Sequence, residues 1–116
     1  MKTLLSTCAL LASLCSPAFA QGSDSCTTPE LIAGTGAFNF DCTTATTGFE
    51  GQGEGLCYAF ASTAVDRDVW FEWTPDFSGM AIITTCGGTT DDTKLAAYPG
   101  SGCPSFGTAI ACNEDD

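Results

Sequence analysis

The cysteines constrain this chain more than any other feature. After the first twenty residues, the remaining 96 residues (116 − 20) hold six of them, at Cys26, Cys42, Cys57, Cys86, Cys103 and Cys112. An even number of cysteines in a small exported domain indicates a disulfide framework, although six cysteines allow fifteen connectivities and sequence alone selects none. Zinc is the weaker interpretation, because the chain has no His and no Cys-x-x-Cys pair. The sequence therefore predicts a small domain held together by covalent cross-links.

The first twenty residues predict export. Lys2 precedes an apolar run over residues 4–14, and a small-residue site, Ala18-Phe19-Ala20, closes the segment. These are the three regions of a secretory signal peptide, and the run is shorter than the ~20 apolar residues that span a bilayer. An acylated Cys15 is the minor alternative, because Leu14 occupies the position where such sites favour a small residue.

We therefore expect a secreted or cell-surface protein without direct membrane insertion. Residues 1–20 are the predicted signal peptide, residues 21–29 a flexible mature N-terminus tied down at Cys26, and residues 30–116 the folded domain. The mature part keeps all 14 acidic residues but only Arg67 and Lys94 as bases, so its formal charge is 2 − 14 = −12. Such a charge repels nucleic acid and anionic bilayers, and it favours solubility, cations or basic partners.

Short alternating segments between turn signals predict an all-β domain. The strongest covers residues 69–74, where Val69, Phe71 and Trp73 share one face. The turn residues 75–79 then predict a hairpin with a second strand over residues 80–86. Further extended segments are expected at residues 38–42, 56–62, 93–98 and 108–112, with a glycine-rich loop at 43–55. The pattern favours an antiparallel β-sandwich, jelly-roll-like and stapled by disulfides.

The last residues predict an incomplete domain. Residues 113–116 have the composition of a turn, after which another strand would follow. A sheet that ended there would leave an unpaired edge beside residues 108–112, which finished proteins normally cover. A naturally frayed polar terminus is the alternative.

Five short motifs occur in a familiar order: DVWFEWT (68–74), SG (78–79), ITTCG (83–87), DTKLAAY (92–98) and ACNED (111–115). The set resembles the bacterial pre-peptidase C-terminal domain and its cysteine-rich relatives. These are extracellular β-sandwich modules appended to secreted proteases and large surface proteins. The likeness covers roughly residues 24–116 and implies further strands after the final turn. The chain departs from the family at Glu114, within a run that is usually Asn and Asp, and at Asp91, which doubles the aspartate before Thr93.

Calcium is the sharpest hypothesis for a bound ion. It takes 6–8 hard oxygen ligands, and the resemblance implies it for some family members. No EF-hand loop is present, so separate loops would have to build the site; the alternative is solvated turn acids, with Asp92 capping a turn. No cofactor is certain. The candidate ligands are Asp66, Asp68, Asp91, Asp92, Asn113, Asp115 and Asp116.

Three aromatic residues form a candidate ligand platform. Exposed faces of Trp70, Trp73 and Tyr98 would stack on sugar rings, whereas core packing is the alternative. Strand alternation points Trp70 and Trp73 to opposite faces, so at most one of them lies in a sandwich core. The partners that these features favour are a polysaccharide, a surface protein or other domains of the same full-length chain.

Catalysis has little support. Without His there is no Ser-His or Cys-His pair, and the cysteines are assigned to bridges. A carboxylate pair is the remaining catalytic option, for which a domain this small leaves little room. We expect a non-catalytic accessory module of a larger bacterial protein, used for attachment, substrate targeting or spacing. The alternatives are a calcium-dependent binding domain, or the N-terminal part of a secreted hydrolase whose catalytic domain lies beyond Asp116.

Overall fold

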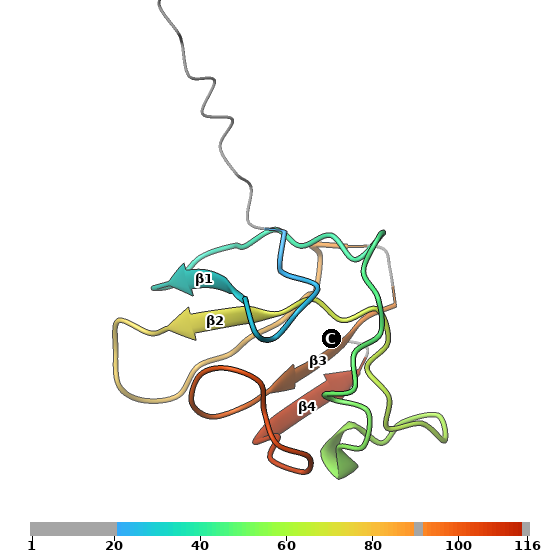
Figure 1. Cartoon of the computed structure of the whole chain (residues 1–116). Coiled ribbons are helices and arrows are strands. Elements are labelled where there is room, and N and C mark those ends of the chain that lie inside the picture. Colours follow the sequence, from blue (N-terminus) through green and yellow to red (C-terminus); the bar gives the residue numbers. More distant parts are fainter. Residues whose placement is uncertain (1–20, 90–91, 115–116) are drawn as a thin grey trace, which may run out of the picture.

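The computed structural model describes residues 21–89 and 92–114. Its elements are β1 (Glu30–Ala33), the short 3-10 helix η1 (Gly55–Cys57), β2 (Phe71–Thr74), β3 (Lys94–Ala97) and β4 (Ala111–Glu114), joined by long loops (Figure 1). The described part of the chain is all-β, as the sequence predicts, and it contains no helix able to cross a membrane. The predicted signal peptide lies outside the described residues.

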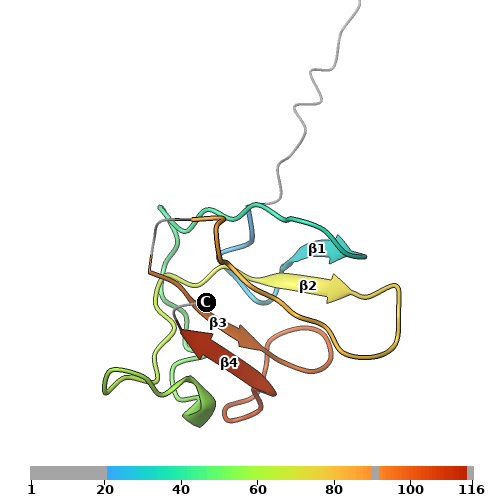
Figure 2. The same cartoon turned by 180° about the vertical axis from the view of Figure 1, so that it is seen from behind.

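The strands form two small sheets. β1 runs parallel to β2, with Glu30 opposite Phe71, and β3 runs antiparallel to β4, with Lys94 opposite Glu114. In the views of Figures 1 and 2, the β1–β2 pair lies above the β3–β4 pair. The strands predicted within residues 69–74 and 93–98 are confirmed, and the first strand, β1, begins at Glu30. Before it, Ser23 already forms a bridge with Trp70.

The predicted hairpin is wrong. Residues 80–86 form no strand, and β2 pairs instead with β1, about forty residues earlier in the chain. Met80 and Ile82 are 91% and 87% exposed, so no sheet covers them. Local turn chemistry predicts that the chain bends after Thr74, but the partner of a strand is decided by tertiary packing.

Three further segments differ from the sequence prediction. Residues 38–42 are irregular, and residues 56–62 contain part of η1 and a tight turn closed by a bridge between Ala59 and Ser62. β4 begins at Ala111 and reaches Glu114, so Asn113 and Glu114 belong to a strand and not to a turn. Only one of the two sheets is antiparallel, which corrects the expectation of antiparallel pairing throughout.

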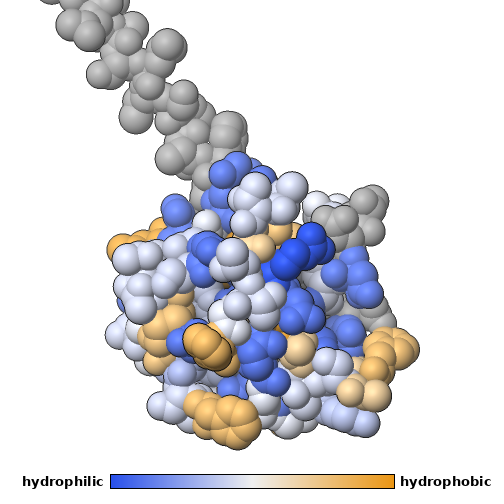
Figure 3. Space-filling model, turned by 45° about the vertical axis from the view of Figure 1, so that its right-hand side comes forward, coloured by the Kyte–Doolittle hydropathy of each residue, from blue (hydrophilic) through white to orange (hydrophobic). Residues whose placement is uncertain are grey.

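Two disulfides cross-link segments of this domain that lie far apart in the sequence. Cys26 bonds Cys103 and Cys57 bonds Cys112, across sequence separations of 77 and 55 residues. Cys26 and Cys57 are the buried hydrophobic residues of the described ranges, at 4% and 3% exposure. Figure 3 shows apolar side chains reaching the surface among polar ones. The disulfide-stapled character predicted from the sequence is therefore confirmed for four of the six cysteines.

Candidate functional site

An open groove of about 1070 Å³, here called the intersheet groove, lies between the two sheets. β2 contributes Phe71, Glu72 and Trp73, and β3 contributes Leu95, Ala96 and Ala97. Most of the remaining walls come from two loop segments, residues 34–43 and residues 77–89, and the rest from Cys26, Pro29, Ile32 of β1, Trp70, residues 98–102 and Pro104. The groove is therefore built mainly from β2, β3 and the two loops that contain segments the sequence predicts as strands, with a contribution from β1.

The three predicted platform residues all line the intersheet groove. The rings of Trp70 and Tyr98 lie 5.9 Å apart between centroids, and those of Trp73 and Phe77 lie 6.2 Å apart. The indole N–H of Trp73 donates to the carbonyl oxygen of Gly34 at 2.6 Å. All three platform residues are half-buried, so they form part of the groove wall and not a flat exposed surface.

Two deeply buried carboxylates stand next to the groove. Asp68 is 6% exposed and accepts hydrogen bonds from the backbone N–H of Gly48 at 2.9 Å and from the Trp70 indole. Glu54 is 2% exposed and accepts the backbone N–H groups of Gly107 at 3.0 Å and of Ala109 at 3.3 Å. Buried charges persist only when such donors satisfy them. Both side chains therefore hold distant loops together.

Tyr98 lies between these two carboxylates. Its hydroxyl group is buried and makes no hydrogen bond within the described ranges. Burial, followed by the negative charges of Glu54 and Asp68, raises the pKa of Tyr98 to about 12. Gly51 passes close by with φ of +80°, and a Cβ there would lie 3.4 Å from the Tyr98 hydroxyl oxygen.

The predicted calcium ligands do not gather in the described part of the chain. Asp68 is occupied by protein donors, while Asp66, Asp92 and Asn113 are exposed. Asp91, Asp115 and Asp116 lie outside the described residues. Among residues 21–89 and 92–114, the one close group of three candidate ligand atoms comes from Cys26, Glu50 and Cys103. It does not fit a metal, because the two sulfurs are bonded to each other.

Cys42 and Cys86 are free thiols in this structure, although the sequence predicts all six cysteines as disulfide candidates. Cys42 is half-buried and Cys86 is exposed, and both line the intersheet groove. The sequence predicts that the other four cysteines form disulfides, but it does not predict which pairs form, because spacing alone selects no connectivity.

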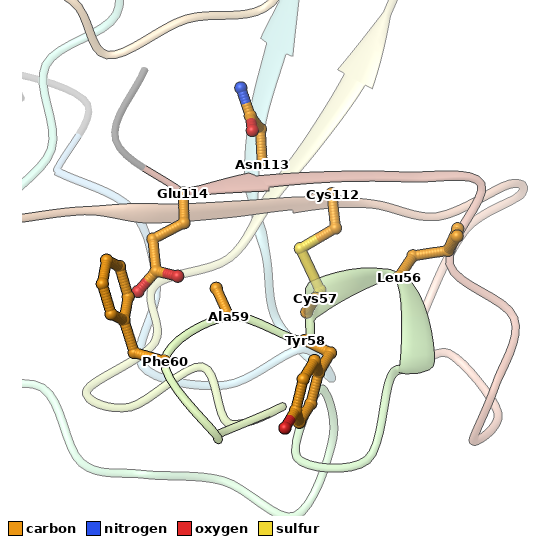
Figure 4. A pocket seen from close by; sticks show the side chains of 8 residues that line it. All are labelled: Leu56, Cys57, Tyr58, Ala59, Phe60, Cys112, Asn113 and Glu114. Carbon is orange, nitrogen blue, oxygen red and sulfur yellow. A yellow bond between two sulfur atoms is a disulfide. The ribbon is translucent and has the colours of Figure 1, made fainter.

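A second, smaller pocket of about 180 Å³ lies under η1 (Figure 4). The side chain of Glu114 points into it beside Phe60, whereas Asn113 points away on the other side of β4. One carboxylate oxygen of Glu114 is buried without a hydrogen-bond partner in the described ranges, and the other lies 3.9 Å from Nζ of Lys94. Lys94 also donates to the carbonyl oxygen of Cys57 at 3.1 Å, so this pocket carries a neutralised charge next to a disulfide.

Sequence reasoning missed Glu54, the most buried acidic residue described. Its one sequence signal is its position between Gly53 and Gly55, where the backbone is free to turn an acid inward. Comparison with protein-family models, with curated proteins and with solved structures gave no match to this chain. The geometry of the groove and of the buried carboxylates is therefore the basis for a functional assignment.

Proposed function

We propose that this chain is a non-catalytic accessory module of a larger secreted or cell-surface protein. In this proposal it is a β-sandwich related to the pre-peptidase C-terminal domains, and its intersheet groove holds an extended polypeptide segment from a neighbouring domain of the same full-length chain. The two intramolecular disulfides are compatible with an extracellular location. Tight binding of that segment would attach this module to the neighbouring domain or hold the two at a set spacing.

The observation that carries the proposal is the open edge of two strands. β2 pairs only with β1, and β3 pairs only with β4, within the described residues. Successive residues of a strand point to opposite faces of its sheet. Three consecutive residues of β2 and three of β3 line the groove, so the groove includes the free edges of both strands, and at Ile32 of β1, opposite Trp73, it also extends over a sheet face. An extended peptide binds such edges through backbone hydrogen bonds, while pockets accept its alternate side chains.

The side chains that line the groove favour a bound peptide with apolar side chains. Phe38, Phe77, Met80 and Ile82 line its loop walls and are exposed. Large apolar patches of this kind mark interaction sites on extracellular and other soluble proteins. The formal charge of −12 in the mature part would attract a segment with basic flanks. A polysaccharide on the aromatic wall is the competing occupant, and it is an outcome of the test below.

The proposal is tested by titrating the mature protein with two probes. The first is a capped peptide, Lys-Val-Thr-Val-Thr-Val-Lys, and the second is cellohexaose, with isothermal calorimetry as the measurement. We expect the peptide to bind, and an analogue that is N-methylated at alternate residues to fail, because it cannot donate to a strand edge. Binding of cellohexaose without binding of the peptide would overturn strand docking in favour of the polysaccharide.

Two isoleucines provide a matched control. Ile82 is exposed and lines the groove, whereas Ile110 is 66% exposed and does not line it. Ile82→Lys places a charge in the path of the peptide, and we expect it to weaken binding at least tenfold, about 1.4 kcal/mol. Ile110→Lys adds the same charge outside the groove and should leave affinity within about twofold. Equal effects of the two variants would show that the peptide binds elsewhere.

A further inference from the structure

Two thiols stand on different walls of the intersheet groove. Cys42 belongs to the loop wall formed by residues 34–43, and Cys86 belongs to the loop wall formed by residues 77–89. In Figures 1 and 2 both segments run back across the molecule from the arrowhead ends of β1 and β2, the first in teal and green and the second in yellow to orange. Cys42 and Cys86 therefore line the same cavity from its two loop walls, so an approach of one wall to the other would bring the two thiols closer.

The other four cysteines leave a single pairing open. Cys26 bonds Cys103 and Cys57 bonds Cys112, so of all the connectivities that six cysteines allow, only one keeps both bridges and pairs every thiol. An unpaired cysteine in an exported domain would be open to oxidation and to intermolecular exchange. We infer that Cys42 and Cys86 form a third disulfide, which ties the two loop walls of the intersheet groove to each other.

The local structure assigns different roles to the two walls. The Cys42 wall is anchored, because the backbone N–H of Asp41 donates to Gln21 at 3.0 Å and Thr46 donates twice to the Asp24 carboxylate, at 2.5 and 2.8 Å. The Cys86 wall lies outside both sheets over residues 80–86 and follows Gly79, whose φ of +137° few other residues adopt, and the Thr85 hydroxyl hydrogen-bonds that of Thr93 at 2.7 Å. Cys86 is the more exposed of the two thiols, so we place the larger part of the approach in the Cys86 segment.

The chemistry is ordinary thiol–disulfide exchange with an external disulfide, such as oxidised glutathione or an oxidising dithiol catalyst. The more exposed Cys86 thiolate attacks the external disulfide, forms a mixed disulfide and releases one thiol. The Cys42 thiolate then attacks the Cys86 sulfur and releases the second thiol. The two protein thiols are oxidised, the external disulfide is reduced to two thiols, and the two protons pass to those products.

A peptide map of the secreted protein tests this bridge directly. The protein is purified without reductant, alkylated with iodoacetamide in denaturant, and digested with trypsin and glutamyl endopeptidase. Cleavage at Lys, Arg and Glu places Cys42 alone in peptide 31–50 and Cys86 alone in peptide 73–94. We expect mass spectrometry to find these two peptides linked and free of alkylation. Two alkylated peptides, or either one linked to a different cysteine, would overturn the inference.

Serine variants separate the bridge from the proposed function. Cys42→Ser and Cys86→Ser should each leave one titratable thiol per chain, and the double variant should leave none; two thiols in the unsubstituted protein would contradict the pairing. The effect of the bridge on peptide affinity rests on the proposed function, in which a peptide strand binds in the groove. There, loss of the tie in the double variant should weaken the peptide probe by about tenfold, because the walls are no longer preorganised. If mass spectrometry finds the two peptides linked but the double variant binds the peptide probe as well as the unsubstituted protein, the bridge stands and only its effect on binding is refuted.

Discussion

Replacing Glu54 tests whether buried carboxylates support this fold. Its two carboxylate oxygens accept the backbone N–H groups of Gly107 and Ala109, at 3.0 and 3.3 Å, from a side chain that is 2% exposed. Hydrogen bonds to charged groups contribute about 1.5–3 kcal/mol each, and the second bond is long, so its share lies at the low end. We expect Glu54→Ala to lower the free energy of unfolding by about 3 kcal/mol. Glu54→Gln keeps an acceptor oxygen and should cost about half as much.

Urea unfolding of the mature protein, with its disulfides intact, measures this loss. The midpoint should fall while the dependence on denaturant stays constant, because the surface exposed on unfolding is unchanged. Asp66→Ala is the control, since Asp66 is exposed, and it should change the free energy of unfolding by less than about 0.5 kcal/mol. If Glu54→Ala behaved like Asp66→Ala, the buried carboxylate would have no structural role and the reasoning would fail.

Three further outcomes follow from the same contacts. Replacing Cys57 and Cys112 together by Ser should cost about 4 kcal/mol in urea unfolding, because their bridge spans 55 residues; a loss below about 1 kcal/mol would contradict this. The folded-state pKa of Tyr98, about 12, lies above its unfolded value of 10.0. The contribution of protonated Tyr98 to the free energy of unfolding is therefore complete below pH 10 and is lost towards pH 12. The stability of Tyr98→Phe should fall less steeply than that of the unsubstituted protein over this interval, and equal slopes would refute it. Since protein donors occupy Asp68, melting temperatures in calcium and in EDTA should agree, and a calcium-dependent rise would favour the calcium hypothesis.

The parts that sequence predicted are those that local chemistry decides. The alternation around Phe71 and Trp73 identifies β2, because aromatic and β-branched residues favour extended backbone wherever they pack. The even number of cysteines indicates disulfides without reference to their pairing. In both cases the signal lies within the segment itself or in its composition.

The parts that sequence missed depend on contacts across the chain. Glu54 is buried because Gly107 and Ala109, more than fifty residues later, bring their backbone N–H groups to it. Residues 80–86 have a strand-like composition, but β2 pairs with β1, and residues 80–86 stay outside both sheets. Neither outcome has a signal at short range, since long-range pairing and loop docking follow from the assembled fold.

The apolar side chains that this domain leaves uncovered connect its stability to its proposed occupant. Phe77, Met80 and Ile82 line the intersheet groove and are exposed. A segment seated in the groove would bury these side chains at about 25 cal/mol per Å² of apolar surface. It would bind the folded chain and not the unfolded one, so binding must raise the melting temperature in proportion to the logarithm of the occupant's concentration. The groove is thus both the docking site that we propose and the part of the domain whose stability most depends on what fills it.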